Sequence, residues 1–263
     1  MATGTLYLVP TPLDFGCEPV AQDLSGALPA HTVAVAAGLT HWITENAKST
    51  RAFLKRVALH QPLALPLQEQ TLLELPRAVH KKGDHTTSQK PGTAFDARPL
   101  LAAALQGQNM GLVSEAGMPA IADPGASVVR AAHALGIPVM PLVGPVSLVL
   151  ALAASGLNGQ DFAFVGYLPQ DAGGRTQRIR ELETLARKTG QTQLCIETPY
   201  RNATLLQALV ATLQPGTRLA LACGLTLPAQ QIRSAPVAEW RAGGTAWASA
   251  LPLDLPTVFL FGL

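Results

Sequence analysis

The sequence predicts an α/β protein made of two α/β domains. Short apolar segments that end in turn residues alternate with longer segments whose apolar residues recur at helical spacing. Met110 to Val143 has the order strand, loop, helix, strand of a βαβ unit. The composition changes at residues 158–161, where Asn, Gly, Gln and Asp follow a long apolar stretch. We therefore expect an N-terminal domain with a mostly parallel sheet, residues 1–157, and a C-terminal domain with a mixed sheet, residues 158–263.

In the first half, most apolar runs mark strands and amphipathic segments mark helices. Segment 33–37 fits a strand or a helix equally well. A helix is expected after Glu45, with Phe53, Leu54, Val57 and Ala58 on its inner side. Residues 76–91 are expected to be a polar loop. Strands are expected at 5–9, 41–44, 63–67, 110–114 and 137–143, and further helices at 98–105, after Gly125 and at 147–154.

In the second half, the same signals continue but the connections between several strands are short. Short connections favour antiparallel pairing, because parallel neighbours need a long crossover. Residues 175–188 predict a polar helix with five basic residues, and 202–213 an amphipathic helix. Strands are expected at 162–167, 191–196, 218–223, 230–234 and 257–261.

The loop from Ser114 to Gly125 is the first candidate for a binding site. It follows a buried apolar strand, and ligands of open α/β sheets bind at the carboxyl ends of strands. Gly117, Pro119, Pro124 and Gly125 leave little side chain between the backbone and a ligand. We therefore expect a ligand to be held there largely by main-chain groups. The other strand ends expected to line such a site carry Pro10, Glu45, Gly144 to Ser147, Glu197 and Ala222 to Gly224.

Bulk properties exclude several classes of protein. Residues 131–160 carry no Asp, Glu, Lys or Arg, but Pro138, Pro141 and Pro145 would interrupt a membrane-spanning helix repeatedly. Three cysteines without a CxxC pair favour a reducing compartment. The N-terminal segment has no basic region typical of a signal peptide, so a cytoplasmic protein is expected. The net charge of +2 confines any contact with nucleic acid to local patches, and 14% charged residues make an oligomer plausible.

Common catalytic motifs are absent from the sequence. There is no GxGxxG after the first strand, no GxxxxGK[ST], no GxSxG and no HExxH. His80 and His85 lie in a polar loop without further ligands at usable spacing, so no metal site is expected. A site lined by small residues suits a small, mostly uncharged cofactor.

Several motifs in register resemble those of one family. LYLVPTP, GLVSEAGMPAIADPG, IPVMPLVGPVSLVLALAASGL, FAFVGYLP, IETPYR and LACGLTLPAQQI are similar, in order, to the motifs of the tetrapyrrole methylase superfamily. Within it they are most similar to the branch of 16S ribosomal RNA ribose 2'-O-methyltransferases. The resemblance implies S-adenosylmethionine as methyl donor, a cofactor cleft between two α/β domains, and a homodimer.

The resemblance also implies residues that contact the donor. Its donor loop corresponds to Ser114, Gly117, Met118 and Ile121, with Pro10 on the neighbouring strand end. Pro145 and Ser147 belong to the next contact. In the second domain, Ile196, Ala222 and Thr257 correspond to residues that close over the adenosine, although each alone is equally explained as a core residue.

Substrate and catalysis involve charged residues. A ribose hydroxyl must lose its proton, and Glu45 or Glu197 at a strand end is a candidate base, or simply a helix cap. Lys48 and Arg51 share one helix face with Lys55 and are candidates for RNA contacts, as is the pair Arg175 and Arg178, although charge on a helix is usually a solvated face. Arg201, beside Glu197, is a candidate for binding an anionic substrate, or simply a salt-bridge partner. ENAKSTR has Asn46 where the ribosomal RNA branch has a second acid, and Leu13 and Asp14 replace a Gly and an Asn. An RNA methyltransferase is therefore expected, with a small-molecule or tetrapyrrole methyltransferase, or a donor-binding protein without catalysis, as alternatives.

Overall fold

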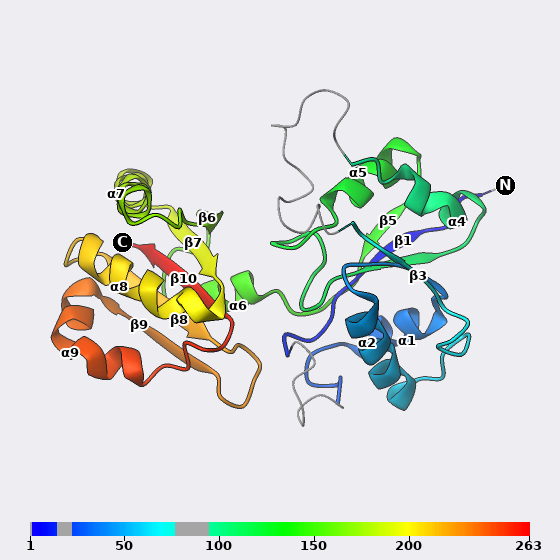
Figure 1. Cartoon of the computed structure of the whole chain (residues 1–263), viewed down its shortest axis with the longest axis horizontal. Coiled ribbons are helices and arrows are strands. Elements are labelled where there is room, and N and C mark those ends of the chain that lie inside the picture. The colour runs from blue at the N-terminus through cyan, green and yellow to red at the C-terminus, as the bar shows by residue number, and fades with distance from the viewer. Residues whose placement is uncertain (1, 15–22, 77–94) are drawn as a thin grey trace. The chain divides into compact units, whose positions relative to one another are not determined.

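The structure is a computed structural model that describes residues 2–14, 23–76 and 95–263. The chain forms two compact units, Met1–Pro145 and Val146–Leu263 (Figure 1). The sequence placed the division after residue 157. The twelve intervening residues contain helix α6 (Ser147–Ser155), which packs against strands β8, β9 and β10 of the second unit.

The first unit is built on a parallel sheet, as the sequence predicted. Its strand order is β3-β2-β4-β1-β5, and every neighbouring pair is parallel. Because all these pairs are parallel, consecutive strands are joined by crossovers that contain helices. The strands are β1 (Leu6–Val9), β2 (His41–Thr44), β3 (Thr71–Glu74), β4 (Met110–Val113) and β5 (Val139–Pro141). The helices are α1 (Ala30–Gly38), α2 (Ala47–His60), α4 (Ala102–Leu105) and α5 (Ala126–Ala134), with the 3-10 helix η1 (Arg98–Leu101) before α4.

Two apolar clusters cover this sheet. One gathers Trp42, Val9 and Val113 with residues of α1 and α2, and the other gathers Leu6, Ile43 and Leu112 with residues of α5 and the η1–α4 segment. Alternate residues of one strand thus enter different clusters, as expected for a strand with both faces covered. All four residues of β4 are buried, which fixes the end of this strand where the candidate site begins.

Two local predictions in this unit were wrong. Residues 63–67 are not a strand: the amide of Glu69 donates to the carbonyl of Pro66 (2.9 Å) in a turn, and the third strand is β3. Proline at position 66 has no amide hydrogen for a sheet, which accounts for the shift. Ala58, expected on the inner side of α2, is exposed, whereas Phe53, Leu54 and Val57 are buried. Segment 33–37, left open between strand and helix, belongs to α1.

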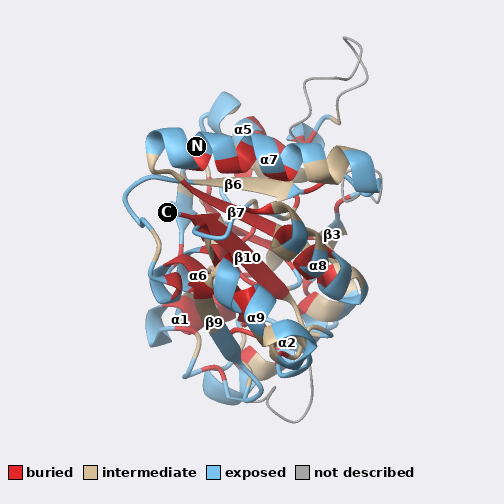
Figure 2. Cartoon of the chain, turned by 90° about the vertical axis from the view of Figure 1, so that its left-hand side faces the viewer, coloured by how far each residue is buried: buried red, intermediate tan, exposed pale blue. Residues whose placement is uncertain are grey.

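The second unit has a mixed sheet, also as predicted. Its order is β6-β7-β10-β8-β9; β6 and β7 are parallel and the other three pairs antiparallel. Figure 2 shows β7 and β10 buried, with helices α7, α8 and α9 on the side of the sheet that faces the viewer. The strands are β6 (Phe162–Tyr167), β7 (Thr192–Glu197), β8 (Arg218–Cys223), β9 (Gln231–Pro236) and β10 (Thr257–Gly262); the helices are α7 (Ala172–Thr189), α8 (Asn202–Thr212) and α9 (Val237–Ser249).

Helix α9 was not predicted from the sequence. It contains Gly243 and Gly244, and Gly244 departs from helical geometry with φ of +52°, so two helical turns meet at a kink. Trp240 on this helix is buried and donates through its indole N–H to the carbonyl of Leu219 (3.0 Å). None of the helices within the described residues has both the length and the apolar character that crossing a bilayer requires.

Candidate functional site

The first candidate site lies where β1, β2 and β4 end. These strands are adjacent in the order β2-β4-β1, with Thr44 and Val9 each paired with Val113. Because the three strands are parallel, the residues that follow them meet at one edge of the sheet. That edge brings together Pro10, Glu45 and Ser114, as the sequence predicted from separate strand ends.

The loops after β1 and β4 are tied together by their backbones. The amide of Thr11 donates to the carbonyl of Gly117, and the amide of Gly117 donates to the carbonyl of Thr11, each at 3.0 Å. Gly117 has φ of +79°, and a Cβ there would lie 3.0 Å from Cδ2 of Leu13. A side chain at this position would therefore strain the backbone and press on the neighbouring loop.

Small residues keep a third segment close to the same place. A Cβ on Gly144 would lie 2.3 Å from Cγ of Pro10, and a Cβ on Gly117 would lie 3.6 Å from the carbonyl oxygen of Pro145. Pro10, Gly117 and Pro145 are thus neighbours in the first unit. Ser147, predicted to act with them, begins α6 and is grouped with the second unit.

Side chains of the loop after β4 differ in their exposure. The hydroxyl of Ser114 is buried and has no hydrogen-bond partner among the described residues. Buried hydroxyls normally have a partner, so this one can still bond to a ligand or water. Met118 is half-buried and Ile121 is 43% exposed, which leaves apolar surface on the same loop. The loop therefore offers one free polar group and two apolar side chains.

Three carboxylates gather beside this loop. Oε2 of Glu45 accepts the amide of Glu115 (3.2 Å), so the ends of β2 and β4 are linked. Partial burial, together with the negative charges of Glu45 and Glu115, raises the pKa of Asp123 from 3.8 to about 7. Asp123 consequently keeps its proton up to about neutral pH. Glu45 was predicted from the sequence, whereas Glu115 and Asp123 were not, because their only signal is their place in the same loop.

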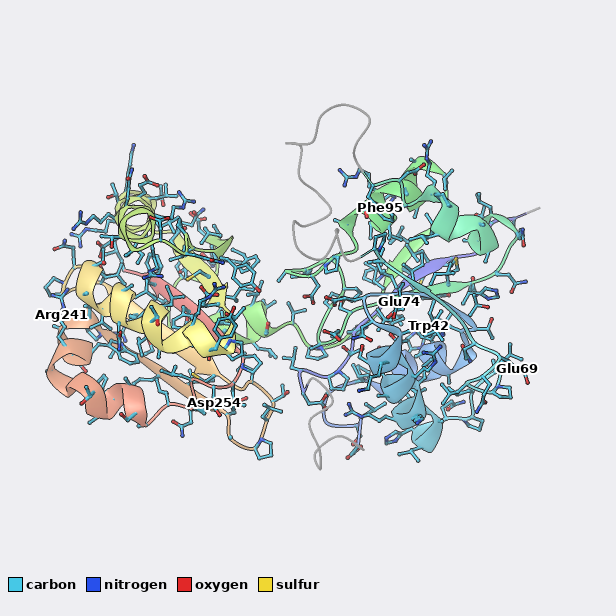
Figure 3. All side chains as sticks on the ribbon, in the orientation of Figure 1. Trp42, Glu69, Glu74, Phe95, Arg241 and Asp254 are labelled. Carbon is cyan, nitrogen blue, oxygen red and sulfur yellow. The ribbon has the colours of Figure 1, made fainter. Side chains whose placement is uncertain are left out.

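Asn46 connects the carboxylates to helix α2. Its Oδ1 accepts the amide of Lys48 (2.9 Å) as an N-cap, and its Nδ2 donates to Oε1 of Glu115 (2.8 Å). Glu74, labelled in Figure 3, ends β3 and accepts the amide of Ala47 (2.7 Å), so a second group caps the helix. An acid at position 46 could not donate to Glu115. The departure at Asn46 therefore has a structural role in holding this cluster.

The basic face predicted on α2 is present. Lys48, Arg51 and Lys55 are all exposed. Arg56, on the inner side, instead forms a bidentate ion pair with Asp14, with Nη2 and Oδ2 2.8 Å apart and both side chains largely buried. Asp14, a departure from the family pattern, thus anchors the loop after β1 to α2.

A second edge, in the second unit, gathers the other predicted residues. Val258 pairs with Ile196 on β7 and with Ala222 on β8, and Thr257 pairs with Glu197 and Cys223. Ile196, Ala222 and Thr257 therefore lie on three adjacent strands at one edge of the sheet. Ala222 and Thr257 are buried and Ile196 is half-buried.

Glu197 is engaged at this edge. Its Oε1 accepts the amide of Thr198 (2.7 Å) and Nη2 of Arg201 (2.8 Å), and its side chain is only 6% exposed. The buried carboxylate is thus already paired with a guanidinium group, so the arrangement favours Glu45 over Glu197 as a base. Arg201, proposed to bind substrate, has its charge balanced by Glu197.

No candidate metal site is found among the described residues. Among residues 2–14, 23–76 and 95–263, no three His, Cys, Asp or Glu side chains are grouped so as to hold a metal ion. His80 and His85 lie outside the described residues. Cys195 is buried, and burial, with the nearby charge of Glu197, raises the pKa of its thiol to about 12, so it is an unreactive core residue.

Comparison with known proteins identifies relatives of the whole arrangement. The family model described as Tetrapyrrole (Corrin/Porphyrin) Methylases matches residues 29–240. A protein of Escherichia coli O157:H7 named "Ribosomal RNA small subunit methyltransferase I" is 32% identical over 236 residues, which are 90% of this chain and 70% of that protein. Proteins of the same name from Vibrio cholerae and Pseudomonas aeruginosa are 35% and 38% identical.

The last two alignments are shorter. They cover 59% and 51% of this chain, and they span about half of the relatives' own length, 51% and 46%. Solved structures agree in fold. The methyltransferase CobJ is matched with a TM-score of 0.53 at 18% identity, covering 100% of this chain and 94% of that one. Uroporphyrin III C-methyl transferase from Thermus thermophilus is matched with a TM-score of 0.52 at 15% identity, covering 98% and 97%.

Proposed function

The chain belongs to the tetrapyrrole (corrin/porphyrin) methylase family, and on that premise we propose that it transfers a methyl group from S-adenosylmethionine to small-subunit ribosomal RNA, at a ribose 2'-hydroxyl. The observation that carries the proposal is the likeness to relatives named for ribosomal RNA methylation, the first of which aligns with 90% of the chain. The cytoplasm as its location and a homodimer as its assembly belong to the same proposal.

The residues at the first edge fit the proposed donor. S-Adenosylmethionine supplies a methyl group that is already activated on a sulfonium sulfur. Gly117 and Gly144 let the loops after β4 and β5 approach Leu13 and Pro10 closely, and the buried hydroxyl of Ser114 has no partner among the described residues. Met118 and Ile121 add apolar contact. We assign donor binding to these residues with Pro10, Pro145, Ser147, Ile196, Ala222 and Thr257, which keeps the assignment made from the sequence.

The chain's part in the reaction is to orient the hydroxyl and to take its proton. Glu45 is the proposed acceptor, because its carboxylate lies at the end of β2 beside the donor loop and accepts a hydrogen bond from the amide of Glu115. Asp123 lies close enough for the charge of Glu45 to raise its pKa, which places a second titratable carboxyl group beside the proposed base. Lys48 and Arg51 are exposed and follow Glu45 on α2, where they are proposed to contact phosphates.

The test uses labelled donor and small ribosomal subunits from cells that lack this methylation. Transfer of label into 16S ribosomal RNA, mapped to a ribose by its resistance to alkaline cleavage, is the expected result. If label enters only small molecules, the substrate is a small molecule and not RNA. Donor binding without transfer to any pool would leave a binding protein.

A matched pair of variants tests Glu45. Glu45→Gln is expected to reduce kcat by about 100-fold or more, the usual contribution of a general base, while the Kd of the donor stays the same. Glu69→Gln, which removes an exposed carboxylate of the same unit (Figure 3), is the control and should be fully active. Full activity of Glu45→Gln would remove Glu45 from this role.

A further inference from the structure

Tyr200 is an aromatic side chain that the fold leaves in solvent. It is 80% exposed, more than any other large apolar or aromatic side chain among the described residues. A ring that stays this exposed gains little stabilisation from hydrophobic burial, so core packing does not explain its presence. A single exposed ring is common on protein surfaces. Whether Tyr200 has a role therefore depends on where the ring lies in the fold and on which side chains fix it.

Its position is at the edge of the second sheet where the proposed donor residues lie. Tyr200 belongs to the 3-10 helix η2 (Pro199–Arg201), which begins two residues after β7 ends at Glu197. Glu197 pairs with Thr257 across the sheet, and Thr257 pairs with Cys223 on β8. The ring is thus carried by the turn that directly follows this edge.

Its support is a fixed guanidinium group. Cζ of Arg201 lies 5.2 Å from the centroid of the Tyr200 ring, within the range of a cation–π contact. Nη2 of Arg201 donates to Oε1 of Glu197 (2.8 Å), and that carboxylate, 6% exposed, is itself bonded to the amide of Thr198. The ion pair with Glu197 therefore fixes the position of Arg201, and the cation–π contact with Arg201 fixes the ring of Tyr200.

This support changes the role expected of Arg201. Its positive charge already has a buried partner in Glu197, so a phosphate would compete with an existing ion pair. The exposed group at this turn is the ring of Tyr200 and not the guanidinium. A flat, apolar, supported ring suits a planar aromatic ligand better than an anion.

We propose that Tyr200 is a stacking platform for one unpaired nucleobase of the RNA substrate, with Arg201 as the residue that positions it. The proposal rests on the proposed function, which supplies RNA as the ligand. Proteins that bind single-stranded RNA stack splayed bases on aromatic side chains, and each such contact strengthens binding by about 5- to 100-fold. A base stacked in this way would hold the substrate without any base-specific hydrogen bond.

The experiment compares four substitutions in the full chain, two at Tyr200, one at Phe162 and one at Arg201. Tyr200→Leu keeps an apolar side chain without a ring, and Tyr200→Phe keeps the ring without the hydroxyl. Phe162→Leu is the matched control, because Phe162 is an aromatic residue, 45% exposed, at the opposite end of the parallel strand β6. Measured are the Kd for small-subunit ribosomal RNA, the Kd for S-adenosylmethionine, the KM and kcat of methyl transfer, and Tm.

Tyr200→Leu is expected to weaken RNA binding by about 5- to 100-fold, the equivalent of one stacking contact, and to raise the KM for RNA accordingly. Tyr200→Phe and Phe162→Leu should stay within about twofold of wild type. Donor affinity and Tm should not change, because the ring is exposed. Arg201→Met, which removes the support, should weaken RNA binding less than Tyr200→Leu does.

The outcomes separate this inference from the proposed function. If wild type methylates RNA and Tyr200→Leu binds it as tightly as wild type, the platform is overturned and the enzyme stands. Equal losses in Tyr200→Leu and Tyr200→Phe would also overturn it, because the hydroxyl would then be the contact. If wild type neither binds nor methylates RNA, the proposed function fails and this inference fails with it.

Discussion

Asp123→Asn is a substitution whose effect on stability should depend on pH. In the folded chain the pKa of Asp123 is raised to about 7 by burial and by the charges of Glu45 and Glu115, against 3.8 for the ordinary group. The folded state therefore holds this proton more tightly than the unfolded state. Between about pH 4 and pH 7, Asp123 ionises in the unfolded chain while it keeps its proton in the folded chain, so the wild-type free energy of unfolding falls as pH rises. Above about pH 7 the loss is complete.

The size of the effect follows from the shift. A pKa shift of about 3 units corresponds to a loss of about 4 kcal/mol in the free energy of unfolding, of which roughly 2.6 kcal/mol is lost between pH 5 and pH 8. Asp123 is only partly buried, and solvent screening reduces the figure to about 1–2 kcal/mol. Asn has the shape of Asp without the titrating proton. The variant should thus become more stable than wild type by about this amount on going from pH 5 to pH 8.

Hydrogen exchange read by mass spectrometry suits this test. Peptides from residues 95–145 report on the first unit separately from peptides of the second, and comparing the two proteins at the same pH cancels the intrinsic pH dependence of exchange. Peptides of the second unit are the internal control and should not differ. If the difference in stability between Asp123→Asn and wild type is the same at pH 5 and pH 8, the coupling among these carboxylates is refuted.

The remaining predictions concern packing, capping and charge. Gly144→Ala should lower the free energy of unfolding by about 1–3 kcal/mol, because its Cβ would lie 2.3 Å from Cγ of Pro10; Gly38→Ala, with nothing within 4 Å, is the control in the same urea titration. Arg241→Met should cost about 1–2 kcal/mol, seen as a lower Tm, because Nε and Nη2 of this residue (Figure 3) donate to carbonyls at the end of α8 at 3.0 and 2.7 Å. Asn46→Asp should destabilise by about 1 kcal/mol at low salt through repulsion by the neighbouring carboxylates, and by less in 1 M NaCl; an effect independent of salt in urea unfolding would contradict this reason.

The strands were largely predictable because their signals are local. β2, β6 and β8 begin and end where the apolar runs predicted, and the antiparallel pairing of the second sheet followed from its short connections. The strand expected at 63–67 failed at Pro66, where a local turn displaced it to Thr71–Glu74. Helix α9 escaped notice because Gly243 and Gly244 weaken the helical signal in its middle.

The candidate site was predictable only in part. Strand ends could be read one at a time, which gave Pro10, Glu45 and Ser114. The grouping of Glu115 and Asp123 with Glu45 depends on β2 and β4 being neighbours, and strand order is a property of the whole sheet. For Arg201 the sequence left a contact with an anionic substrate and a salt bridge both open, since residues four apart meet only if a turn brings them together, and the structure shows the salt bridge with Glu197.

The reciprocal bond between Thr11 and Gly117 has a mechanical consequence. Two segments separated by more than a hundred residues share a pair of hydrogen bonds, so neither can open without breaking both. Their amide protons should therefore exchange with solvent at one common rate. A replacement at either position would loosen the far segment as much as its own.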